Sequence, residues 1–158
     1  MQDEHNEFMK IAIKCSDHSI DNKIGGPFGA IIVKDGKVIS EAWNTVTTDN
    51  DPTAHAEVNA VRKACRALKN FKLDGCIIYT SCEPCPMCLS AIYWARIEKI
   101  YYANTRVDAA NINFDDNFLY EELNTPIENR KVPIVQICRD LALKTFEKWA
   151  ASMEKIEY

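Results

Sequence analysis

The chain has 158 residues, of which 47% are hydrophobic and 27% charged, and a formal net charge of -4. This length suits one domain with a substantial core, and the composition excludes a disordered chain. Lys and Arg are scattered among acids instead of forming one tract, which argues against nucleic acid as a partner. We therefore expect a single domain over residues 1–158.

Seven cysteines and the N-terminal residues bear on the cellular compartment. The first residues lack a basic region followed by an apolar core, and no stretch approaches the length of a membrane span. An odd number of cysteines in such a chain favours reduced thiols over a disulfide framework. The sequence therefore predicts a cytoplasmic protein without a membrane partner.

The N-terminal part predicts a helix followed by a hairpin. Apolar residues at helical spacing place the helix over roughly residues 3–19. The next stretch, "IGGPFG", lacks the spacing and the lysine of a phosphate loop, which favours a tight backbone approach at the mouth of a strand. Strands over residues 30–34 and 37–43 then flank an Asp35-Gly36 turn.

A second helix is predicted from Asp51 and Pro52 to about residue 69, because Asp caps helices and Pro suits their first turn. Its apolar stripe is headed by a carboxylate, Glu57. The other members of the stripe are Val61, Ala64, Cys65 and Leu68. A carboxylate on a buried face needs a partner or a chemical task.

The rest of the chain alternates strands and helices. Residues 76–81 predict a buried strand, residues 86–97 a helix, and residues 99–104 another strand. This order implies parallel neighbours with helices packed on the sheet faces. After a polar segment, residues 132–138 predict a strand and residues 141–153 a last helix. The expected fold class is α/β, a three-layer α/β/α sandwich with a mixed central sheet.

Two cysteines stand where a helix is predicted to begin. If Cys85 caps the helix that Pro86 starts, Cys85 and Cys88 lie on one face and can converge on one ion. The positive end of the helix dipole favours the thiolate form that binds metal. Thiolates with an imidazole suit zinc. Among the three histidines, His55 is the candidate, because it lies beside Glu57 on the second helix.

Cys82 leaves two kinds of zinc site open. It forms C-x-x-C-x-x-C with Cys85 and Cys88, and together with His55 these thiols would make a closed structural site with four protein ligands. An iron–sulfur run is excluded locally, because its next ligand would fall at Ile92. Glu57 favours the open, three-ligand site, since a structural site needs no carboxylate beside its histidine.

The combination of "HAE" at residues 55–57 with "PCPMC" at residues 84–88 matches the H-x-E…P-C-x-x-C signature of zinc-dependent nucleobase deaminases. The stretches "GGPFGAIIVKDGKVI", "NDPTAHAEVNAVRKAC" and "YTSCEPCPMCLSAIYWAR" resemble the bacterial guanine deaminase branch of the cytidine deaminase-like superfamily. The resemblance covers nearly the whole chain. It implies the cytidine deaminase-like fold and hydrolytic conversion of guanine to xanthine and ammonia.

The resemblance also implies roles for individual residues. One Zn2+ per subunit would be held by His55, Cys85 and Cys88, with water in the fourth position and Cys82 beside the site. Glu57 would move protons between water, the purine and the departing ammonia. The substrate-binding residues implied by the resemblance, with Asp116 preferred to its neighbour Asp115, are Asn44, Phe28, Asp116, Trp94 and Tyr158.

Several of these substrate roles have a structural alternative. Asn44 could donate to and accept from a purine edge, or form a turn. Phe28 and Trp94 could line the pocket or fill core, and Asp116 could read purine N–H groups or lie in a solvated loop. By resemblance, Tyr158 ends a segment that closes over a pocket and is exchanged between the subunits of a homodimer in some members.

The implied substrate is a small purine base, and two other functions compete with it. A guanosine deaminase or a tRNA adenosine deaminase would share the zinc motif, although the mixed charges of the tail do not favour a polyanion. A non-enzymatic, zinc-stabilised binding module is the third alternative. The position of Glu57 beside His55 disfavours that module.

Overall fold

A four-stranded mixed sheet forms the centre of the first part of the chain. The structure, a computed structural model, describes residues 2–158. The strands lie in the order β2-β1-β3-β4. β1 is antiparallel to both of its neighbours, whereas β3 and β4 are parallel, as predicted. The four strands are β1 (Gly29–Lys34), β2 (Lys37–Trp43), β3 (Cys76–Cys82) and β4 (Lys99–Asn104).

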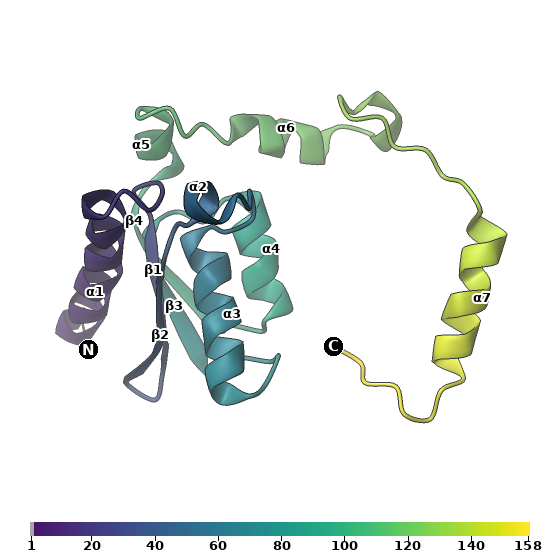
Figure 1. The fold of residues 1–158 in the computed structure, drawn as a ribbon, viewed down its shortest axis with the longest axis horizontal. Coiled ribbons are helices and arrows are strands. Elements are labelled where there is room, and N and C mark those ends of the chain that lie inside the picture. Colours follow the sequence, from purple (N-terminus) through teal and green to yellow (C-terminus); the bar gives the residue numbers. More distant parts are fainter. Residues whose placement is uncertain (1) are drawn as a thin grey trace. The chain divides into compact units, whose positions relative to one another are not determined.

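Helices cover both faces of this sheet (Figure 1). α1 (Gln2–Asp21) packs on the face that Ile31 and Tyr79 share, whereas α3 (Ala56–Leu68) and α4 (Pro86–Trp94) pack on the other face. Successive residues of a strand point to opposite faces, so the central strands β1 and β3 are buried on both sides. The predicted three-layer α/β/α arrangement is confirmed.

The hairpin and the glycine loop before it have the predicted backbone features. Asp35 and Gly36 adopt left-handed φ values of 48° and 70°. Positive φ at both central residues is typical of the type I′ turn, whose twist matches that of the two strands it joins. In the preceding loop, a Cβ on Gly25 would lie 2.5 Å from Oδ1 of Asn44. Glycine at this position therefore allows the loop backbone to approach the end of β2.

The start predicted for the second helix was wrong. α3 begins at Ala56, and His55 is its N-cap. Oδ1 of Asp51 instead accepts hydrogen bonds from the backbone N–H and the hydroxyl of Thr53, at 2.8 and 2.7 Å. This local turn competes with helix capping by Asp51. A short helix, α2 (Val46–Asp49), lies before this turn and was not predicted.

The segment after β4 differs from the prediction in two respects. The expected polar segment contains two helices, α5 (Arg106–Ala110) and α6 (Asn117–Asn124). Residues 132–138 form no strand in the described structure. A strand requires a hydrogen-bonded neighbour, which an apolar run cannot supply for itself. The predicted last helix is present as α7 (Arg139–Ala150).

The chain divides into two compact units, the first ending at Asp116 and the second comprising Asn117–Tyr158. The second unit contains α6, the short 3-10 helix η1 (Ile127–Asn129) and α7. Many of its large apolar side chains are exposed, including Val135, Phe146 and Trp149. None of the described helices has the length and the apolar run that crossing a membrane requires.

A hydrogen-bonded aromatic cluster lies between α1 and the sheet. Nδ1 of His5 lies 2.6 Å from the hydroxyl of Tyr79, and Nε2 lies 3.0 Å from the hydroxyl of Tyr101. The rings of Tyr79 and Tyr101 stack with centroids 5.0 Å apart. Burial raises the pKa of Tyr79 to about 12, and the neighbouring Tyr101 and Glu4 act in the same direction.

We expect Tyr79 to make the protein lose stability as the pH rises from about 10 to about 12. The folded pKa exceeds the ordinary value of 10.0, so the unfolded chain loses the phenol proton first and ionisation favours unfolding. The full difference corresponds to about 2–3 kcal/mol. Urea unfolding across this range should show a steeper loss for the native protein than for Tyr79→Phe. The exposed Tyr102→Phe is the control, and equal slopes for native protein and Tyr79→Phe would contradict the prediction.

Candidate metal centre and active site

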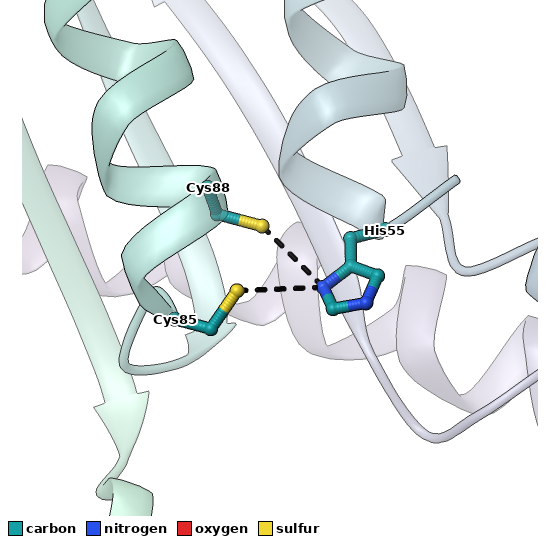
Figure 2. A group of neighbouring side chains, drawn as sticks. All are labelled: His55, Cys85 and Cys88. Atoms are coloured by element: carbon teal, nitrogen blue, oxygen red, sulfur yellow. Dashed lines mark hydrogen bonds between the residues drawn. The ribbon is translucent and has the colours of Figure 1, made fainter. Parts of the chain in front are cut away.

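Three side chains from two helix starts meet in the first unit (Figure 2). His55 is the N-cap of α3, Cys85 is the N-cap of α4, and Cys88 lies in the first turn of α4. Nδ1 of His55 lies 3.7 Å from Sγ of Cys85 and 3.5 Å from Sγ of Cys88. All three donor atoms lie within 4.8 Å of one another.

These distances fit a tetrahedral zinc ion. With ordinary zinc–sulfur and zinc–nitrogen bond lengths, tetrahedral geometry places neighbouring donors about 3.5–3.8 Å apart. Two thiols and one imidazole are also the ligand types that zinc prefers. The three donors found here therefore match the ion in spacing and in chemistry, and three protein donors leave one position of the tetrahedron open.

The local sequence explains why the donors converge. Pro86 occupies the first turn of α4, where its fixed φ and missing N–H are tolerated. The backbones of Cys85 and His55 are extended, with φ/ψ of -64°/166° and -69°/155°. Neither side chain makes a capping hydrogen bond within its own helix. Both side chains are thereby available for the shared centre between α3 and α4.

Protons are distributed unequally over the donors. A hydrogen bond from Cys88 lowers the pKa of Cys85 to about 4, and a hydrogen bond with His55 adds to this effect. The same bond to Cys85, together with burial, raises the pKa of Cys88. The hydrogen bond with Cys85 raises the pKa of His55. Cysteine binds a metal as thiolate, so binding at this centre requires that any proton held by the two thiols is released.

The buried carboxylate of Glu57 contacts one of these donors, Cys88. Glu57 lies in the first turn of α3 and is only 6% exposed. Its Oε1 accepts a hydrogen bond from Oγ1 of Thr80 at 3.3 Å, and its Oε2 accepts one from Sγ of Cys88 at 3.4 Å. Burial raises the pKa of Glu57, so the carboxyl group takes up a proton more readily. Such a group suits proton transfer at the centre.

Asn44 lies directly after β2 and is almost fully buried. Its Oδ1 accepts hydrogen bonds from the backbone N–H groups of Gly26 and Val46, both at 3.2 Å. Two N–H donors on one oxygen fix the orientation of the side-chain amide. The side-chain oxygen of Asn44 is therefore already occupied, and the role of Asn44 in substrate binding stays a prediction.

Phe28 and Asp116 lie in the same unit as the three donors. Phe28 packs edge-to-face on Phe114, with ring centroids 5.0 Å apart and planes at 90°. Burial raises the pKa of Asp116, and the charge of Cys85 acts in the same direction. Phe114 was not predicted from the sequence. It lies in an irregular segment, where no periodicity marks a contact residue.

Cys82 and Trp94 are not gathered at the donors, and Tyr158 belongs to the second unit. Cys82 donates a weak hydrogen bond from Sγ to the carbonyl of Thr105 at 3.6 Å, and it does not belong to the donor group found among the described residues. Trp94 is 61% exposed at the C-terminal end of α4, and Tyr158 is 76% exposed in the second unit. Substrate-binding roles for Trp94 and Tyr158 stay predictions.

Comparison with known proteins places this centre in a family. Residues 2–104 match the family described as the cytidine and deoxycytidylate deaminase zinc-binding region. The chain belongs to this family. The predicted zinc cofactor, the hydrolytic enzyme class and the cytidine deaminase-like fold are thereby confirmed.

Two relatives within the deaminase family differ in how much of the chain they match. A guanine deaminase of Bacillus subtilis (strain 168) is 52% identical over 154 residues, which cover 98% of this chain and 99% of the relative. A tRNA-specific adenosine deaminase of Aquifex aeolicus is 45% identical over 96 residues, covering 61% and 63%. An X-ray structure of guanine deaminase from Bacillus subtilis superimposes with a TM-score of 0.95 and covers 98% of both chains.

Proposed function

We propose that this protein is a zinc-dependent guanine deaminase that hydrolyses guanine to xanthine and ammonia. The observation that carries the proposal is the likeness to the Bacillus subtilis guanine deaminase over 98% of the chain. The likeness to the adenosine deaminase of Aquifex aeolicus covers only 61%. The substrate assignment therefore draws on the whole chain, including the part beyond the metal centre.

The chemistry follows from the buried carboxylate and the three donors. When bound by His55, Cys85 and Cys88, zinc lowers the pKa of a water molecule toward neutrality. Glu57 takes one proton from the attacking water and delivers it to N3 as the C2=N3 double bond opens, and then carries the second proton from the resulting hydroxyl to the exocyclic amine. The C2–O bond forms, the C2–N bond to the exocyclic amine breaks, and ammonia leaves.

The purine is held by groups of complementary polarity. Asn44 donates its amide N–H groups to acceptor atoms of the purine, because its oxygen is already occupied by two backbone N–H groups. Asp116 accepts from the N–H groups that guanine carries and adenine lacks. Phe28 stacks on the ring, and the edge-to-face contact with Phe114 holds its plane.

Substrate choice is tested by ammonia release from a panel of guanine, guanosine, adenine, cytosine and tRNA, with the purified zinc-loaded protein. We expect guanine to give the highest kcat/KM. Turnover confined to tRNA would replace the proposal by adenosine deamination, which the Aquifex aeolicus relative favours. No release from any substrate would favour the zinc-stabilised binding module.

We further propose a cytoplasmic homodimer in which the segment 117–158 of one protomer covers the site of its partner. All seven thiols are free, which suits a reducing compartment. Apolar side chains of the second unit are exposed, among them Ile137 and Met153. In the first unit, β4 is an edge strand and Tyr93 on α4 is exposed. A second copy of the chain would bury surfaces of this kind.

Mixing two inactive variants tests this exchange. One variant carries Glu57→Gln with an intact C-terminal segment, and the other keeps Glu57 but lacks residues 156–158. If the partner supplies the segment, subunits refolded together at equal amounts should regain about a quarter of native activity, because half of the dimers are mixed and each holds one complete site. A mixture that stays inactive, or a truncated protein that is fully active alone, would contradict the exchange.

A further inference from the structure

Thr80 lies on the face of β3 that packs against α3. Tyr79 belongs to the cluster on the α1 side, whereas Ile78 belongs to the cluster on the α3 and α4 side, and strand alternation places Thr80 with Ile78. Thr80 pairs with Ala30 of β1 and with Tyr102 of β4, so its backbone is held on both sides. Its side chain is buried at 1% exposure. Thr80 therefore faces the start of α3 from a rigid position.

The hydroxyl of Thr80 donates a hydrogen bond to Oε1 of Glu57, at 3.3 Å. The other side-chain donor to this carboxylate is Cys88, whose Sγ lies 3.4 Å from Oε2. A cysteine that binds zinc does so as a thiolate and has no proton to donate. Metal binding therefore removes the hydrogen bond from Cys88 to Glu57. Of the two side-chain donors found for Glu57 in the described structure, Thr80 is the one that remains.

We propose that Thr80 is a positioning residue for the deamination reaction. Its hydroxyl holds Oε1 of Glu57, which prevents rotation of the carboxylate and leaves Oε2 directed toward the metal donors. The proposal rests on the proposed role of Glu57 as proton carrier. Proton transfer depends on placement of the carboxylate to a fraction of an ångström, so loss of this hydrogen bond slows the reaction without any contact between Thr80 and the purine.

The kinetic test compares Thr80→Val with Thr80→Ser. Valine keeps the shape of threonine but removes the donor, and we expect kcat to fall about 10- to 100-fold, as for loss of a hydrogen bond to a charged group, with KM and zinc content unchanged. Serine keeps the hydroxyl and should retain kcat within about threefold of native. An unchanged kcat in Thr80→Val, an increase in KM alone, or equal losses in both variants would overturn the proposal.

A second measurement does not depend on guanine turnover. The Tm of four zinc-loaded proteins is compared: native, Thr80→Val, Glu57→Ala and the double variant. If the hydroxyl bonds the carboxylate, the Tm change of the double variant should be smaller than the sum of the two single changes. Additive changes would overturn the proposal. If the native protein released no ammonia from guanine, the proposed function would fail, whereas this comparison would still decide whether Thr80 holds Glu57.

Discussion

Glu57→Gln should retain its zinc and lose guanine turnover by about 100- to 10,000-fold, the range that general acid–base catalysis contributes. Glutamine has nearly the same shape as glutamate, and its amide oxygen can still accept the hydrogen bond from Thr80. It cannot take a proton from water. Steady-state xanthine formation and metal analysis on the same preparation measure both effects.

The matched control for this variant is Glu41→Gln, which makes the same change at an exposed position on β2. It should leave both zinc content and turnover at the native level. Near-native turnover by Glu57→Gln with full zinc occupancy would exclude Glu57 as the proton carrier. Loss of zinc from Glu57→Gln would instead indicate that the carboxylate supports the metal centre itself.

His55→Ala and Cys85→Ala should each lose zinc and, with it, activity. Two of the three donors remain in either variant. Loss of a residue that only hydrogen-bonds a metal ligand typically lowers metal affinity by about 10- to 100-fold, so we expect loss of a ligand itself to lower zinc affinity by more than about 100-fold. Because the metal binds the folded state, added zinc should raise the Tm of the native protein but not that of the variants. Competition with a chromogenic chelator measures the affinity.

Cys65→Ala is the control for removal of a thiol as such. Cys65 lies in α3 but does not belong to the donor group, so this variant should bind zinc as the native protein does. Native zinc affinity in Cys85→Ala would contradict the three-donor centre. Equal loss of zinc in Cys65→Ala and Cys85→Ala would show that the loss follows from weakened folding and not from removal of a ligand.

The parts of the site that the sequence predicted depend on signals within a few residues. Pro86 marks the start of α4, so the spacing of Cys85 and Cys88 could be converted directly into a shared helix face. The turn at Asp35-Gly36 likewise fixes the hairpin, because both residues tolerate left-handed backbone conformations. Local rules of this kind predicted the placement of Cys85 and Cys88 at the start of α4, and the hairpin of β1 and β2.

Features in which two local arrangements compete, or which depend on distant segments, were not predictable in this way. Asp51 is a good helix cap in isolation, but in the structure its carboxylate closes a turn with Thr53. The amide oxygen of Asn44 accepts from the backbone N–H groups of Val46, two residues away, and of Gly26, 18 residues away, and the second contact is not visible in the sequence. The apolar run at residues 132–138 has the composition of a strand, but strand formation depends on a neighbour that composition does not specify.

The two N-cap positions at the centre have a consequence for folding. Most helices begin with Ser, Thr, Asp or Asn, whose side chain bonds a free backbone N–H and contributes about 0.5–2 kcal/mol. α3 and α4 begin with His55 and Cys85, which make no such bond. Both helices at the metal centre thus lack the stabilising hydrogen bond of an ordinary N-cap side chain. An ion bound between them would link the two helix ends, so the first turns of α3 and α4 should fray together when the metal is removed.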